Sequence, residues 1–206
     1  MLNGNLAVLG IPPDVKLVAV TKTRTVEEIR HAIMSGVTCI GENRVQEAEK
    51  KFPFLPKVEK HMIGHLQTNK VKLAVELFDM IQSVDSLKLA EEISKRCETI
   101  GKVMPVLVEV NIGNEPNKYG IKPEDAGSFV KEISKLKNID VQGLMCVAPL
   151  LAPEETRPYF KKMKQLFGSV GNMKWLSMGM SNDYKTAIEE GSNMVRIGTA
   201  IFGYRV

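Results

Sequence analysis

Lys22 is the residue whose position most clearly suggests chemistry. It follows residues 17–21, a short run of apolar and β-branched residues typical of a strand buried on both faces. An ammonium that loses hydration at such a strand end is driven toward the neutral amine, and repulsion from Arg24 would act in the same direction. Lys22 is therefore a candidate nucleophile. The alternative is that Lys22 only marks the point where the chain returns to water.

Two segments near the C-terminus suggest an anion site. SMGMSND (177–183) and VRIGTA (195–200) each run from a strand into a turn of small residues. Ser181 and Thr199 could donate hydroxyl hydrogen bonds, and Gly198 would let the backbone come close to a phosphate. Ordinary helix capping is the alternative, because Ser and Thr also favour that role. A lysine paired with a phosphate site suits pyridoxal 5′-phosphate, whose aldehyde forms a Schiff base with an amine.

The elements that must position these residues repeat along the chain. Eight strand-like segments are each followed by a helix-like segment, which predicts a (β/α)8 TIM barrel formed by residues 1–206 as a single domain. An open doubly wound sheet is the alternative. Residues 1–16 are expected to be weakly structured. The strands are expected at 17–21, 38–43, 60–65, 80–84, 104–112, 139–147, 174–179 and 193–198.

The active site of such a barrel lies at the carboxyl ends of its strands. Asn43 and His65 fall there, and for His65 a structural and a catalytic role are both open. Glu42 and Asp85 could act as general bases, although carboxylates at strand ends also cap the next helix. Met178 fits a pocket wall or core packing. Three further residues, expected to have no role or to be exposed, are His61, Lys118 and Tyr119.

Composition excludes several classes of protein. The 206 residues are 44% hydrophobic and 25% charged with a net charge of +4, and their basic residues alternate with acidic ones, so no nucleic-acid-binding stripe is present. No apolar run reaches the roughly 20 residues of a membrane span. The three cysteines have no spacing typical of zinc or disulfides, which favours a reducing, cytoplasmic location.

Motifs spread along the chain resemble one known family. LVAVTKT, IGENRVQE, HMIGHLQTNK, QSVDS, VNIGNEPNKYG, GLMCVAP, LSMGMSNDYKTAI and VRIGTAIFG are similar, in this order, to segments of the YggS/PROSC family of pyridoxal phosphate homeostasis proteins. The resemblance extends from about Lys16 to the C-terminus. The chain departs from the family pattern in its short segment before the first strand, which leaves closure of the barrel bottom open, and in having Arg24 where a lysine is frequent.

The resemblance implies a barrel like the N-terminal domain of bacterial alanine racemase, with pyridoxal 5′-phosphate covalently bound to Lys22. Arg196 would face the pyridine nitrogen of the cofactor. An arginine can only donate, so it would keep that nitrogen unprotonated and the ring a weak electron sink. A salt bridge to Glu189 or Glu190 is the alternative role for Arg196. The resemblance also implies that Ser181, Gly198 and Thr199 contact the phosphate. It further implies that Asn43, His65 and Met178 line the pocket of the pyridine ring.

Three functions compete. The first is a monomeric carrier that holds the cofactor reversibly for homeostasis, forms external aldimines with amino acids and serves apo-enzyme recipients transiently. The second is a weak amino-acid racemase, for which we expect at most trace activity, because such racemases take a second acid/base group, a tyrosine, from a further β-domain. The third is a class I aldolase that binds its carbonyl substrate on Lys22.

Overall fold

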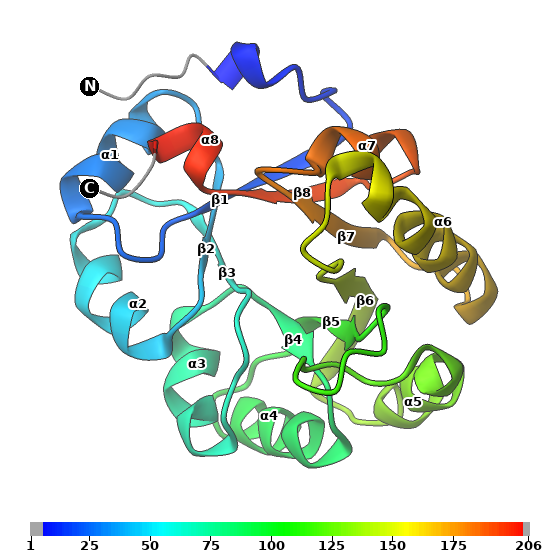
Figure 1. Ribbon diagram of the computed structural model, residues 1–206. Helices are drawn as coiled ribbons and strands as arrows, with labels where there is room; N and C mark the ends of the chain where they lie inside the picture. The colour runs from blue at the N-terminus through cyan, green and yellow to red at the C-terminus, as the bar shows by residue number, and fades with distance from the viewer. Residues whose placement is uncertain (1–5, 204–206) are drawn as a thin grey trace.

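Eight parallel strands close into a barrel, as the sequence predicts. The computed structural model describes residues 6–203, and Figure 1 shows the helices arranged outside the ring of strands. Each strand pairs in parallel with the next, and the last pairs with the first. The strands are β1 (Lys16–Val20), β2 (Cys39–Glu42), β3 (Glu59–Met62), β4 (Met80–Val84), β5 (Met104–Val110), β6 (Ile139–Cys146), β7 (Trp175–Met180) and β8 (Met194–Ile197).

A helix follows each strand and covers the outside of the barrel (Figure 1). The first begins with a capping box, in which the Thr25 hydroxyl accepts from the Glu28 N–H at 3.2 Å and Glu28 accepts from the Thr25 N–H at 2.7 Å. The α-helices are α1 (Val26–Met34), α2 (Val45–Lys51), α3 (Val71–Leu77), α4 (Leu87–Thr99), α5 (Ala126–Ile133), α6 (Pro153–Val170), α7 (Tyr184–Glu189) and α8 (Thr199–Phe202). Four 3-10 helices are η1 (Leu6–Leu9), η2 (Phe52–Phe54), η3 (Thr68–Lys70) and η4 (Pro123–Asp125).

The hydrophobic core has two parts. The larger lies between strands and helices and includes Ile29, Phe78 and Phe160, all fully buried. The smaller lines the lumen of the barrel and consists of Val18, Cys39, Met80, Leu107, Met145 and Met194. Because side chains of a strand alternate between these two parts, the alternation decides which polar residues enter the lumen.

The N-terminal segment is more ordered than its sequence suggests. The expectation of weak structure in residues 1–16 is wrong for η1, while residues 1–5 lie outside the described part of the chain. The Tyr184 hydroxyl donates to the Leu9 carbonyl at 2.9 Å, a contact between residues far apart in sequence. At the bottom of the barrel Trp175 packs against the lumen cluster, with Lys16 Nζ 5.2 Å from its ring centre, so an aromatic side chain closes this end.

Candidate functional site

Lys22 lies in a tight turn just beyond β1. The Arg24 N–H donates to the Thr21 carbonyl at 3.1 Å and closes the turn around Lys22, which is partly exposed. Thr23 has φ of +63°, a left-handed conformation that strains a β-branched residue. Such strain persists only where neighbouring contacts impose it. Contacts with residues outside the turn therefore hold the Lys22 turn in this conformation.

A partly buried ionic network between α2 and the ends of β1 and β2 provides this hold. Lys51 Nζ donates to Glu42 Oε1 at 2.7 Å, to Glu47 Oε2 at 2.9 Å and to the Thr21 carbonyl at 3.0 Å. The same Oε2 of Glu47 accepts the Thr23 N–H at 2.9 Å, and Glu42 Oε1 accepts the Thr21 hydroxyl at 2.9 Å. Glu42 is fully buried, and this burial raises its pKa although Lys51 opposes the shift. Glu42 thus has a structural role rather than that of an exposed general base.

The two small-residue turns meet across β7 and β8. The Gly198 N–H donates to the Ser181 hydroxyl oxygen at 3.1 Å, which brings together the two segments that the sequence marks as a phosphate site. The turn after β7 is fixed by Gly179, whose φ is +95° and whose added Cβ would lie 2.6 Å from the Cβ of Ala187. Thr199 is exposed at the first position of α8. A hydroxyl that accepts one hydrogen bond still has its own proton to donate.

These turns adjoin the Lys22 turn because β8 pairs with β1. The register places Ala19 beside Ile197, and a Cβ added at Gly198 would lie 3.4 Å from that of Val20. Arg24 also connects the two regions, since it donates to the Gly203 carbonyl, while its ion pair with Glu28 at 3.2 Å offsets its charge. The candidate amine and the candidate phosphate turns therefore lie on neighbouring strand ends.

Arg196 points into the lumen beneath this edge. It is 3% exposed, and its guanidinium donates to the Ser177 hydroxyl at 2.7 Å and to the Cys146 carbonyl at 2.9 Å. The alternative salt bridge to the acidic pair on α7 is wrong. Glu189 and Glu190 are instead bound by Arg157, each at 2.7 Å.

The mouth of the lumen also contains a half-buried carboxyl. Glu109 lies at the end of β5, and burial raises its pKa to about 7, with a smaller contribution from Asp85 and an opposing one from Arg196. A half-buried carboxyl with a raised pKa, whose shift Arg196 partly opposes, is an electrostatic feature that the sequence did not reveal.

Asn43 and His65 line a neighbouring cavity of about 720 Å³ at the same end of the barrel. The His65 ring stacks on Tyr119 with centroids 3.6 Å apart and planes at 8°, and His65 Nδ1 lies 3.4 Å from Asp85 Oδ2. Tyr119 is exposed as expected, but it forms part of this wall rather than a free loop. Oδ1 of Asn43 is buried without a hydrogen-bond partner among residues 6–203. An unpaired buried acceptor indicates a position for a ligand or water donor.

Comparison with known proteins agrees with this arrangement. The family model described as alanine racemase, N-terminal domain, matches residues 4–206. A pyridoxal phosphate homeostasis protein of Aquifex aeolicus is 43% identical over 198 residues, covering 92% of this chain and 87% of that protein. One of Pasteurella multocida is 41% identical over 204 residues, covering 93% and 87%. The chain belongs to the family of pyridoxal phosphate homeostasis proteins.

Solved structures show the same fold for this family member. PipY of Synechococcus elongatus, solved with PLP bound, has a TM-score of 0.89 at 36% identity, covering 97% of this chain and 98% of that one. An alanine racemase of Clostridium difficile has a TM-score of 0.76 at 18% identity, covering 98% of this chain but 56% of the racemase. At that identity the racemase shows the likeness of the fold alone.

Not every predicted site residue of this homeostasis-family protein lies at the barrel mouth. The Met178 side chain is fully buried in the core outside the barrel, so a contact from Met178 to a ligand would have to come from its backbone. Sequence reasoning missed Ser177, Gln82 and His61, which enter the lumen. Their alternation along β7, β4 and β3 is the signal that could have found them, once the inward face of each strand is known.

Proposed function

We propose that this protein binds pyridoxal 5′-phosphate reversibly through Lys22 and acts in the homeostasis of that cofactor. The observation that carries the proposal is the meeting of the Lys22 turn with the hydrogen-bonded pair Ser181 and Gly198 on adjoining strand ends. The names of the relatives and the PLP-bound state of PipY support the same cofactor.

The residues present fit this group. When bound, the cofactor supplies an aldehyde that condenses with a primary amine and releases one water. Lys22 offers the amine, Ser181 and Thr199 offer hydroxyl donors for a phosphate, and Gly198 lets the backbone come close to it. The unpaired Oδ1 of Asn43 indicates a further polar contact at the mouth.

The roles of the remaining residues follow from their positions. Arg196 would lie against the pyridine nitrogen, and His65 with Asn43 would border the ring. Burial lowers the pKa of Arg196, but arginine begins so high that it stays protonated. A permanent donor at the ring nitrogen keeps the ring a weak electron sink, which supports holding and release of the cofactor over catalysis. We therefore propose a carrier without a dedicated reaction.

The binding partners, the oligomeric state and the location of the protein belong to the same proposal. Residues 1–206 would act as one cofactor-binding barrel, as a monomer, with amino acids and apo-enzymes as transient partners. All three cysteines, Cys39, Cys97 and Cys146, are free and buried, which supports a reducing, cytoplasmic location. Within residues 6–203, the structure contains no helix that is both long and apolar enough to cross a membrane.

A racemase is the second candidate, because the family model and the Clostridium difficile structure place the same barrel in alanine racemases. The barrel covers 56% of that racemase, and a racemase needs acid/base groups on both faces of its substrate. We propose at most trace activity for this chain.

Titration with pyridoxal 5′-phosphate tests the proposed function. The protein should acquire a visible absorption band of the lysine-bound cofactor, and Lys22→Ala should abolish the band. Lys88→Ala is the matched control, since Lys88 is exposed near the start of α4 and lies outside the cavity that Asn43 and His65 line. Absence of the band from the unsubstituted protein, or an equal band in Lys22→Ala, would contradict the proposal.

A further inference from the structure

A continuous line of hydrogen bonds crosses the inside of the barrel from top to bottom. Ser177 Oγ accepts from Arg196 at 2.7 Å and donates to Gln82 Oε1 at 2.7 Å. Nε2 of Gln82 lies 2.7 Å from Nδ1 of His61. His61 Nε2 in turn lies 2.8 Å from Glu59 Oε1. We call Arg196, Ser177, Gln82, His61 and Glu59 the lumen chain.

The direction of donation is fixed from both ends. Arg196 can only donate, and the Glu59 carboxylate can only accept. Burial lowers the pKa of His61, so its ring is neutral and has one N–H. That hydrogen must be on Nε2 facing Glu59, which leaves Nδ1 to accept from the Gln82 amide. Every link then donates toward Glu59, whose pKa is lowered to about 2, chiefly by the His61 hydrogen bond.

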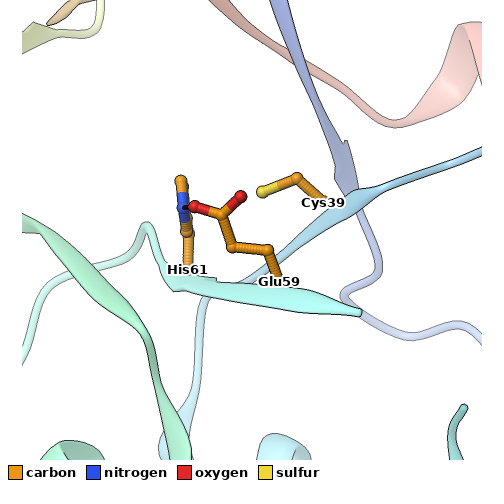
Figure 2. Close-up of side chains that lie close together, drawn as sticks. All are labelled: Cys39, Glu59 and His61. Atoms are coloured by element: carbon orange, nitrogen blue, oxygen red, sulfur yellow. Dashed lines mark hydrogen bonds and ion pairs between the residues drawn. The ribbon is translucent and has the colours of Figure 1, made fainter. Parts of the chain in front are cut away.

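The lower end of the lumen chain has the composition of a metal site. Figure 2 shows Cys39 on β2 beside Glu59 and His61 on β3, with the carboxylate between the thiol and the imidazole. These groups already have other partners. Lys16 Nζ lies 2.7 and 2.5 Å from the two oxygens of Glu59, and both ring nitrogens of His61 are engaged. Lys16 therefore anchors the lower end of the chain.

The lumen chain has a structural consequence for Arg196. His61, Gln82 and Ser177 are fully buried, so no water can replace a missing link. Two contacts, to Ser177 and to the Cys146 carbonyl, fix the plane of the guanidinium. The same contacts fix the direction of its remaining N–H donors.

We propose that Gln82 and His61 are positioning residues that orient Arg196 for the ring of pyridoxal 5′-phosphate, with Glu59 and Lys16 as the fixed lower end. This inference rests on the proposed cofactor function. It assigns a purpose to five buried or half-buried polar groups in a barrel lumen that apolar side chains could otherwise fill.

The chain itself can be tested without cofactor, by ¹⁵N NMR of the histidine rings. His61 should be neutral with its hydrogen on Nε2, and should stay neutral at about pH 5.5, below the ordinary histidine pKa of about 6.5. A hydrogen on Nδ1 of His61, or a His61 ring that is protonated at about pH 5.5, would overturn the lumen chain.

The coupling to the cofactor is tested with Gln82→Met, which preserves volume and removes both links. Loss of orientation at Arg196 should weaken cofactor affinity about ten-fold and change the pH dependence of the bound cofactor's absorption. Gln82→Glu in its protonated form can still accept from Ser177 and donate to His61, so at low pH its cofactor affinity should equal that of the unsubstituted protein at the same pH. Met80→Leu, an apolar change on the same strand and in the same lumen, should alter neither.

The outcomes separate the two proposals. Failure of the unsubstituted protein to bind cofactor would contradict the proposed function and with it the role of Arg196, whatever the state of His61. Normal binding with unchanged affinity and spectrum in Gln82→Met would overturn the positioning role alone. An equal loss in Met80→Leu would attribute the effect to packing and also overturn it.

Discussion

Lys51→Met is the substitution whose effect can be worked out most fully. It removes the ammonium 2.7 Å from Glu42 Oε1, and Glu42 is fully buried with its Oε2 unpaired among the described residues. Within residues 6–203, the Thr21 hydroxyl would remain as the only hydrogen-bond donor to the Glu42 carboxyl. Removing one partner of a buried ion pair typically costs about 3–5 kcal/mol, because the remaining charge is uncompensated.

Protonation of Glu42 limits this loss and makes it depend on pH. From an ordinary pKa of 4.5, neutralising the carboxyl costs about 1.4 kcal/mol per pH unit, or at most about 3.4 kcal/mol at pH 7 and about 1.4 at pH 5.5. Burial raises the pKa of the Glu42 carboxyl in the folded state. The stability linked to this carboxyl is therefore present below its unfolded pKa and is lost as pH rises. The variant should therefore be destabilised by about 3 kcal/mol at pH 7 and about half as much at pH 5.5.

Urea unfolding at both pH values measures these differences. Lys50→Met, a change at the exposed neighbour on the same helix, should have little effect, and the double variant Glu42→Gln/Lys51→Met should recover most of the loss at pH 7. The Lys22 turn, which loses its Thr21 contact to Lys51, should also bind cofactor more weakly. Equal destabilisation at both pH values, or a loss at pH 7 no larger than that of Lys50→Met, would refute the reasoning.

Three further predictions concern the site. Ser181→Ala and Thr199→Ala should each weaken cofactor affinity about ten- to a hundred-fold, because each removes a hydrogen bond to a charged phosphate worth roughly 1.5–3 kcal/mol; unchanged affinity of both variants in a fluorescence titration would locate the phosphate elsewhere. Burial is the main cause that raises the pKa of Glu109 to about 7, so this residue should lower the stability of the protein as pH rises from about 4.5 to about 7. Glu109→Gln should remove that loss. The measurement compares the unfolding free energies of the variant and the unsubstituted protein at pH 5 and at pH 8. An identical pH dependence in the two proteins would contradict this account of Glu109. Saturating L-alanine should change the spectrum of the cofactor-loaded protein but yield negligible D-alanine in a chiral assay, whereas sustained turnover on the order of 1 per second would show an enzyme.

Local signals explain why most of the fold could be predicted. The capping box of Thr25 and Glu28 depends on four consecutive residues, and β4, a short strand-like segment between two helix-like segments, matches its expected bounds. The site turns were predictable for the same reason, since Gly198 and Ser181 stand in short strand-to-helix segments.

The rest depends on closure of the barrel. Which face of β3 is inward depends on its register with β2 and β4, so the sequence could not show that His61 meets Gln82 from a strand 21 residues away. The same holds for Lys51, which reaches back to the β1 turn, and for Tyr184, which binds Leu9 and orders the N-terminal segment. Such contacts between distant segments are decided by tertiary packing, not by local pattern.

Covalent attachment to Lys22 is the central claim, and borohydride reduction followed by peptide mapping tests it most directly. The protein is loaded with pyridoxal 5′-phosphate, reduced, digested and analysed by mass spectrometry. We expect the pyridoxyl group on the peptide containing Lys22 in close to one equivalent, and no comparable label after Lys22→Ala. A label found only on another lysine, or labelling that Lys22→Ala leaves unchanged, would contradict the account.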